Sequence, residues 1–306
     1  MSRDTACEQT GENMDQGEPI TETSGLGRDP DMEYEAIARW LGAIEFGWDI
    51  ERALEFALFR TYAVPSISGL LARTGKFEAE PRRRYDDTEL LLSEPMEHGI
   101  DSPRGAEAVA RINAIHGRFR ISNDDMLYVL STFVCEPVRW CGRYAKRPFT
   151  DDETRAWTNY YRHLGARMGI AGIPESFEAF DRLNRAYEDA HFRFAASNKR
   201  IAVASLDLLL GFYLPRPLFG LGRPVALSLM DTPLLLAMGF EPPPPGTQRL
   251  VKRAMTLRKW VLARLPRRKT PRLITARKRP SYPGGYAISE LGGVPRQGAV
   301  RTPSRS

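Results

Sequence analysis

The sequence predicts an all-α protein. Apolar residues recur at three- and four-residue intervals along most of the chain, which is the period of one face of an α-helix. The alternating pattern of β-strands is scarce, and no internal repeat is evident. With 306 residues, 42% of them hydrophobic, the chain is long enough to bury a sizeable core. We therefore expect a single domain of packed helices.

The net charge of +6 is distributed unevenly along the chain. Residues 249–279 contain thirteen lysines and arginines but no aspartate or glutamate. Such a run suits phosphates, anionic lipid or an acidic partner, and it is equally typical of a solvated helix and tail. Because no nucleic-acid recognition motif accompanies it, we expect no nucleic-acid partner.

The cysteines and the hydropathy favour a cytoplasmic protein. Cys7, Cys135 and Cys141 fit neither a zinc spacing nor a disulfide framework, and no signal peptide is apparent. No run of 18 or more apolar residues appears. The most apolar stretch, residues 201–240, is interrupted by prolines and charged residues, so we expect buried or surface-bound helices there.

The chain is expected to begin with a disordered segment, because residues 1–30 are polar, acidic and glycine-rich. Helical periodicity follows over residues 31–62. Pro65 and Pro81 each suit the first turn of a further helix, and Gly75 separates the two. The first third of the folded part is therefore a series of helices with short connections.

Five further helices are predicted between residues 106 and 212. The first covers residues 106–120. Residues 123–125 cap the second, which we expect Pro137 to stop. Thr150 and Glu153 have the spacing of a capping box at the start of the third. The last two cover residues 177–195 and 201–212.

A proline-rich break at residues 241–246 precedes a basic amphipathic helix. Its apolar positions form one stripe, made of Leu250, Ala254, Leu257, Val261 and Leu265. This stripe either docks on the core of the protein or makes peripheral contact with a membrane through Leu250–Leu265. Beyond Pro266 we expect a flexible basic tail. The predicted organisation is thus a disordered segment (1–30), a helical domain (31–240) and a C-terminal region (241–306).

One histidine lies on an apolar helical stripe. Within residues 106–120, Val109, Ile112, His116 and Phe119 fall three or four positions apart and share one face. An imidazole that faces an apolar interior needs a partner, which is either a structural hydrogen bond or a metal such as haem iron. An all-α core can hold a flat cofactor between helices, as the globins do.

A second group of polar residues lies on the helix expected from Pro81 to about Glu97. Arg84, Asp87 and Thr88 share a face of that helix by their spacing. That face is either solvated or turned toward a bound ligand, and both alternatives stay open. The arginines that are candidates for pairing with haem propionates are Arg84, Arg111, Arg118 and Arg120.

Three common catalytic patterns are missing from the sequence. It has no phosphate-binding glycine loop, no Gly-x-Ser-x-Gly elbow and no helical zinc spacing of histidines. The residues therefore do not favour nucleotide hydrolysis, α/β-hydrolase chemistry or a zinc enzyme.

Four segments of the chain, taken in order, resemble a known family. They are RALEFALFRTYAVPSISGLLARTGKF, RRYDDTELL, RINAIHGRFRISNDDMLYVLSTFVCEPVRW and HLGARMGIAGIPESFEAFDRLNRAYE. They resemble the MpaB-like oxygenases, which are distantly related to the latex-clearing rubber oxygenases. The resemblance covers roughly residues 31–240, which is most of the foldable chain.

The resemblance implies a globin-like helical fold around a b-type haem and an activity that cleaves carbon–carbon double bonds of isoprenoid chains with O₂. His116 matches the proximal iron ligand of the family. Arg84 and Thr88 match the Arg-x-x-Lys-Thr pattern that rubber oxygenases carry on the distal side, whereas Asp87 stands in place of the lysine. An acidic group at that position would be a proton acceptor near substrate or oxygen. The upstream carboxylate base of the rubber enzymes has no counterpart that we can align.

The sequence therefore predicts a haem-dependent oxygenase that acts with O₂ on a lipophilic small molecule. His116 is expected to bind the iron, Arg84 to contact the haem, and Arg84, Asp87 and Thr88 to be catalytic. Two other interpretations stay open. One is a haem-binding protein without turnover, and the other is a helical interaction module that works through its basic C-terminal segment, with His116 as a core residue.

Overall fold

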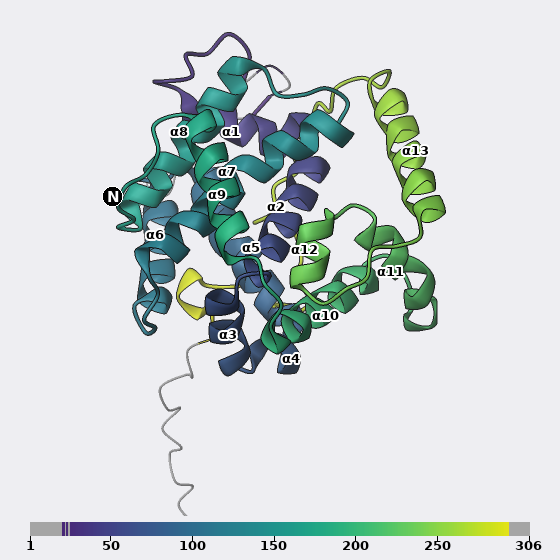
Figure 1. Cartoon of the computed structure of the whole chain (residues 1–306). Helices are drawn as coiled ribbons and strands as arrows, with labels where there is room; N and C mark the ends of the chain where they lie inside the picture. The colour runs from purple at the N-terminus through teal and green to yellow at the C-terminus, as the bar shows by residue number, and fades with distance from the viewer. Residues whose placement is uncertain (1–19, 22, 24, 294–306) are drawn as a thin grey trace, which may run out of the picture.

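The computed structural model describes residues 20, 21, 23 and 25–293, and this part of the chain is all-α, as predicted (Figure 1). It contains thirteen α-helices and no strand. The helices are α1 (Tyr34–Trp40), α2 (Gly47–Tyr62), α3 (Pro65–Arg73), α4 (Lys76–Ala79), α5 (Pro81–His98), α6 (Pro103–His116), α7 (Asn123–Tyr144), α8 (Asp151–Arg167), α9 (Phe177–His191), α10 (Ala196–Gly211), α11 (Phe219–Leu227), α12 (Thr232–Ala237) and α13 (Pro245–Leu262). Most of residues 1–30, for which we predicted disorder, lies outside the described residues.

Helices α2 and α7 form the centre of the fold and pack against each other (Figure 1). Helix α1 packs on α8, and α9 packs on α7. The largest buried side chains of this core include Trp40, Tyr128 and Trp157. A second apolar cluster joins the end of α2, at Phe59 and Tyr62, to α10 and α12. Burial of these apolar faces is the main force that holds the helices together.

Most predicted helix boundaries are confirmed by the local geometry. Pro65 and Pro81 occupy the first turns of α3 and α5, and Gly75 has a φ of 64°, which a side chain would disfavour. The capping box of α8 is present: the Glu153 amide donates to the Thr150 hydroxyl at 3.2 Å, and the Thr150 amide donates to the Glu153 carboxylate at 2.8 Å.

The prediction that Pro137 stops its helix is wrong. Helix α7 continues through Pro137 to Tyr144. A proline cannot donate a hydrogen bond to the carbonyl four residues earlier, which here belongs to Phe133. That carbonyl instead accepts a hydrogen bond of 3.1 Å from the indole of Trp157 on α8. A side chain from a neighbouring helix thus replaces the missing backbone bond.

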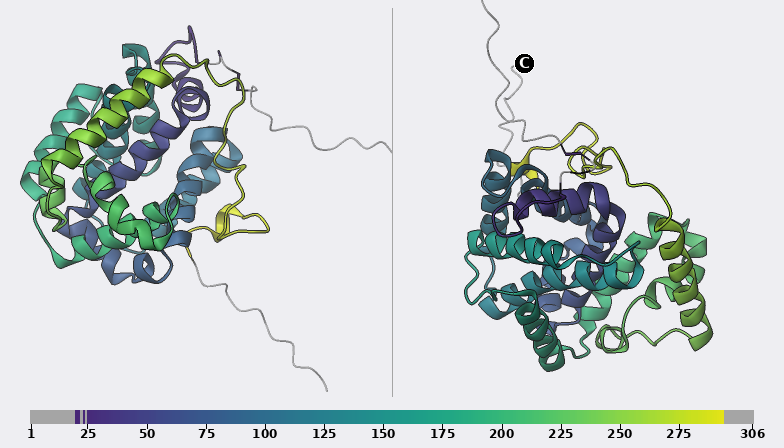
Figure 2. Two further views of the ribbon diagram at one scale, coloured as in Figure 1. Left: turned by 90° about the vertical axis from the view of Figure 1, so that its right-hand side faces the viewer. Right: turned by 90° about the horizontal axis from the view of Figure 1, so that it is seen from above.

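The prediction of a flexible tail beyond Pro266 is also wrong for residues 267–293, which we call the strap. The strap runs back across the molecule beside α5 and α6 (Figure 2). Its Ile274 amide donates to the Glu97 carboxylate at 2.5 Å, and its Tyr286 hydroxyl donates to Glu94 at 2.6 Å. The strap therefore supplies partners to acidic side chains of α5, which its Pro- and Gly-rich composition does not indicate.

Helix α13 docks on the rest of the protein with a face other than the predicted stripe. Val251 is buried, and the Arg258 guanidinium donates to the Asp49 carboxylate at 2.9 Å and to the Tyr144 carbonyl at 3.2 Å. All five stripe residues are exposed: Leu250, Ala254, Leu257, Val261 and Leu265. The alternative in which this stripe docks on the core is therefore wrong.

Candidate functional site

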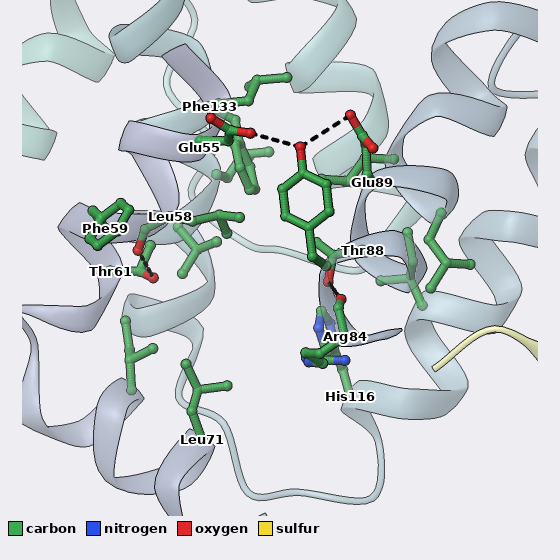
Figure 3. A pocket seen from close by; sticks show the side chains of 18 of the residues that line it. Glu55, Leu58, Phe59, Thr61, Leu71, Arg84, Thr88, Glu89, His116 and Phe133 are labelled. Carbon is green, nitrogen blue, oxygen red and sulfur yellow. Dashed lines mark hydrogen bonds between the residues drawn. The ribbon is translucent and has the colours of Figure 1, made fainter. Parts of the chain in front are cut away.

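A cavity of about 600 Å³ lies between α2, α3, α5, α6, α7 and α10. Its walls are mainly apolar, with Leu58, Phe59 and Leu71 on one side and Phe133 at one end (Figure 3). This volume is within the range of cofactor and small-molecule sites, which are mostly apolar with a few polar groups. The polar groups of this cavity come chiefly from α2, α5 and α6.

His116 is the last residue of α6 and lines the cavity, as predicted for an interior-facing imidazole. Its Nδ1 atom is buried and makes no hydrogen bond with any described residue. Burial lowers the pKa of His116, and the nearby Arg84 guanidinium lowers it further, so the imidazole is neutral at neutral pH. A neutral imidazole with an unpartnered ring nitrogen has the chemistry that a metal ligand needs. The alternative of a structural hydrogen bond at this atom finds no partner in the described chain.

Arg84 and Thr88 line the same cavity from α5 (Figure 3). The Thr88 hydroxyl donates to the Arg84 carbonyl at 2.9 Å, and the Arg84 guanidinium lies beside His116 and over the Phe77 ring, at 5.6 Å from its centroid. Burial is the largest influence on the pKa of Arg84 and lowers it. For these two residues, the solvated-face alternative is wrong.

Asp87 is not among the residues that line the cavity, so the prediction that it faces the same pocket as Arg84 and Thr88 is wrong. It is buried, and it accepts hydrogen bonds from the Tyr282 hydroxyl and from the Gly292 amide, both in the strap. At 100° per residue, the side of α5 that carries Asp87 is turned away from the cavity wall, and the strap fills that side. Burial raises the pKa of Asp87.

The cavity also contains polar residues that sequence reasoning missed. Tyr85 on α5 donates to Glu55 on α2 at 2.7 Å, and its hydroxyl lies 3.4 Å from Glu89. We call Glu55, Tyr85 and Glu89 the carboxyl cluster. Arg52 pairs with Glu55 at 2.8 Å, and Arg279 of the strap pairs with Glu89.

Burial dominates the protonation of the carboxyl cluster. It raises the pKa of Glu55 to about 8, against the opposing influence of Arg52 and of the Tyr85 hydrogen bond, with Glu51 and Glu89 adding like-charge repulsion. It also raises the pKa of Glu89. The only sequence signal for the cluster is the placement of Tyr85 and Glu89 four residues apart on one helix face. The facing Glu55 depends on how α2 packs, which the sequence does not give.

The four arginines proposed for propionate pairing separate into two groups. Arg84 and Arg120 line the cavity. Arg111 instead donates to the Leu291 carbonyl of the strap at 2.8 Å, and Arg118 is exposed outside the cavity lining. Helix α6 stops at His116, so Phe119 lies beyond the helix; it is 39% exposed but still lines the cavity together with Ile112 and His116.

The donor set fits haem iron better than a metal ion held by protein side chains alone. Within the described residues, no group of three or more His, Cys, Asp or Glu side chains could hold a metal ion. A haem iron needs only one protein ligand, because the macrocycle supplies four nitrogens. His116 offers that one ligand at the wall of a large apolar cavity, and Arg84 and Arg120 offer cations for the propionates.

The structure defines a helical protein whose apolar cavity is lined by an imidazole with an unpartnered nitrogen. Comparison with known sequences identifies the family. Residues 57–260 match the family described as ER-bound oxygenase mpaB/B'/Rubber oxygenase, catalytic domain, and the chain belongs to this family. It is 30% identical over 226 residues to ER-bound oxygenase mpaB of Penicillium roqueforti (strain FM164), which covers 68% of this chain and 76% of the relative.

Two further relatives come from Penicillium brevicompactum. ER-bound oxygenase mpaB' is 29% identical over 283 residues, and ER-bound oxygenase mpaB is 27% identical over 273 residues. Each match covers 87% of this chain, but only 64% of the first relative and 62% of the second. The chain thus spans less than two thirds of the length of these two proteins.

Proposed function

We propose that this protein is a haem-dependent oxygenase that uses O₂ to cleave carbon–carbon double bonds of isoprenoid or other lipophilic chains. The observation that carries the proposal is the buried, unpartnered Nδ1 of His116 at the wall of an apolar cavity of about 600 Å³. Membership of an oxygenase family supports the same chemistry. Addition of both oxygen atoms of O₂ across a double bond gives two carbonyl products, so the reaction balances without a further reductant.

His116 would hold the haem iron, and Arg84 and Arg120 would pair with the propionates. The haem, when bound, would supply the activation of O₂. The apolar walls of the cavity would then bind the lipophilic chain of the substrate, and Leu58, Leu71 and Phe133 would exclude water from it.

The carboxyl cluster gives the cavity a group that can hold and release a proton. Burial raises the pKa of Glu55 to about 8, so this carboxyl can gain and lose a proton near neutral pH. Tyr85 Oη, hydrogen-bonded to Glu55, keeps that carboxyl in a fixed orientation. We propose that Glu55 is the carboxyl that exchanges protons in the cavity. Asp87 does not have this role, because it accepts a hydrogen bond from Tyr282 of the strap.

The proposal is tested by the absorption spectrum of protein produced with adequate haem, followed by incubation with polyprenyl compounds and O₂. We expect a Soret band that is lost or shifted in His116→Ala. His191→Ala is the matched control, since His191 lies outside the cavity lining and its ring stacks on Tyr187. Carbonyl-ended products would support the oxygenase, and a haem-loaded protein without products would instead indicate a haem carrier or sensor. A folded protein that takes up no haem would refute the proposal.

We also propose a cytoplasmic location with peripheral membrane contact. The relatives are named ER-bound. Among the described residues, no single helix is long and apolar enough to cross a membrane, and one pair of helices, residues 196–211 and 216–227, meets the length and composition criteria only together, with a bend of 118° between them.

A further inference from the structure

We propose that α11, α13 and the residues next to them form a docking surface for membranes that contain anionic lipids. The exposed apolar residues of this surface, which we call the α11–α13 face, are Leu218, Leu221, Val225, Leu250, Leu257, Trp260, Val261 and Leu265. Helices α11 and α13 contact each other and lie on one side of the molecule (Figures 1 and 2). The binding itself does not depend on the proposed oxygenase activity.

The orientation of α13 leaves its apolar stripe uncovered. The helix is held to α2 by Arg258, which pairs with Asp49, and to α7 by Lys259, which donates to the Gly142 carbonyl at 2.9 Å. With that side fixed, the stripe at positions i, i+7 and i+11 turns outward. Leu250 is 68% exposed, Leu257 62% and Val261 42%. Nothing in the described chain covers these side chains.

Helix α11 presents a second apolar row. Leu218, Leu221 and Val225 fall at positions i, i+3 and i+7 and are 41%, 73% and 47% exposed. The other side of α11 is fixed, because Gly222 is buried against the side chains of Leu210 and Leu214. Two adjacent helices therefore expose apolar rows that a soluble monomer rarely leaves uncovered.

The charges around these rows complement an anionic surface. Arg249, Lys252 and Arg253 are exposed and make no ion pair with any described residue. No aspartate or glutamate occurs between residues 242 and 289. Each basic side chain near an anionic bilayer strengthens binding, and apolar residues flanked by cations are the pattern of helices that lie in the membrane interface.

Two features favour a lipid surface over a second copy of the chain. A self-associating face would bring two such cationic segments together, which opposes association. In addition, Trp260 is 54% exposed, and the Arg264 guanidinium lies 3.5 Å from its ring centroid. Tryptophan with a neighbouring cation is typical of the boundary between lipid headgroups and acyl chains.

Docking by this face would bring the cavity close to the lipid. Helix α11 packs on α10, and α10 contributes Ser205, Leu208 and Leu209 to the cavity wall. Only α11 and α10 would then lie between the bilayer surface and the site, which suits a substrate that partitions into lipid. This consequence, unlike the binding, rests on the proposed function.

The test is flotation of the purified full chain with vesicles of phosphatidylcholine, alone or mixed with phosphatidylglycerol. We expect binding to the mixed vesicles that weakens with salt, and much less binding to phosphatidylcholine alone. Removing two cations in Lys252→Gln/Arg253→Gln should lower the partition coefficient about thirtyfold. Arg182→Gln, an exposed cation on α9, is the control and should lower it little.

The apolar contribution is tested with Leu250→Ser/Leu257→Ser. The control is Met32→Ser, because Met32 is 79% exposed and is not part of the α11–α13 face. Brominated lipids should quench a fluorescence component that disappears in Trp260→Phe. Circular dichroism establishes that each variant is folded. The proposal is overturned if the wild type does not bind mixed vesicles, if the control variants lose as much binding, or if the stripe variants abolish a concentration-dependent dimer instead.

Discussion

The contact between Tyr282 of the strap and Asp87 of α5 allows a quantitative prediction. Asp87 is 3% exposed and Tyr282 8%, so water cannot replace the phenol if it is removed. In Tyr282→Phe, Asp87 keeps the Gly292 amide but loses the Tyr282 hydroxyl. A hydrogen bond to a charged group contributes about 1.5 to 3 kcal/mol, so we expect the free energy of unfolding to fall by about 2 kcal/mol.

The matched control is Tyr286→Phe, which removes the same atom from the same segment. Tyr286 donates to Glu94, whose side chain is fully buried. Glu94, however, also accepts two hydrogen bonds from Arg104, at 2.8 and 2.6 Å. Because this carboxylate keeps its cation, we expect a smaller loss, of about 1 kcal/mol.

Urea unfolding followed by circular dichroism measures both losses, and an unchanged dependence on urea concentration establishes that the comparison is valid. The reasoning predicts an order as well as a size: Tyr282→Phe must cost more than Tyr286→Phe. Equal costs, or the reverse order, would show that the partners remaining at each carboxylate do not determine the loss.

Two further changes test the site and the helix that carries His116. The pKa of Glu55 is about 8 in the folded protein and 4.5 ordinarily, so the free energy of unfolding falls as the pH rises through this interval. Glu55→Gln should remove up to about 4 kcal/mol of this fall, measured as the difference in the free energy of unfolding between about pH 5 and about pH 9. In Gly105→Ala, the new methyl group would meet the Gly99 carbonyl oxygen, and we expect a loss of about 3 kcal/mol in thermal or urea unfolding. Gly142→Ala is its control, because the space there is open and alanine favours a helix. A destabilised Gly142→Ala, or a pH profile that Glu55→Gln leaves intact, would contradict the respective argument.

The predictions that the structure confirms depend on local helical geometry. His116 and Ile112 face the same cavity because they are four residues apart on α6. Arg84 and Thr88 reach the cavity together for the same reason, since a separation of four residues rotates a side chain by only about 40°. Such relations hold whatever the helix packs against, so the sequence alone can supply them.

The predictions that failed depend on partners distant in the sequence. Asp87 is turned from the cavity toward Tyr282, 195 residues away. Helix α7 tolerates Pro137 because the indole of Trp157, on α8, donates a hydrogen bond to the Phe133 carbonyl. Glu55 belongs to the site only because Tyr85, 30 residues later, packs opposite it. Periodicity identifies the buried face of each helix, but it does not identify the neighbour that the face meets.

The strap also affects the order in which the protein can be completed during synthesis. The acidic side of α5 emerges from the ribosome early, whereas its partners at Thr275, Tyr282 and Tyr286 follow 178 to 195 residues later. Until then Asp87 and Glu97 lack the hydroxyl partners that the strap supplies, and Glu94 has only its pairing with Arg104. A recombinant fragment limited to the family match at residues 57–260 would lack the strap and retain these carboxylates without their partners. An expression boundary for this protein therefore belongs after residue 293.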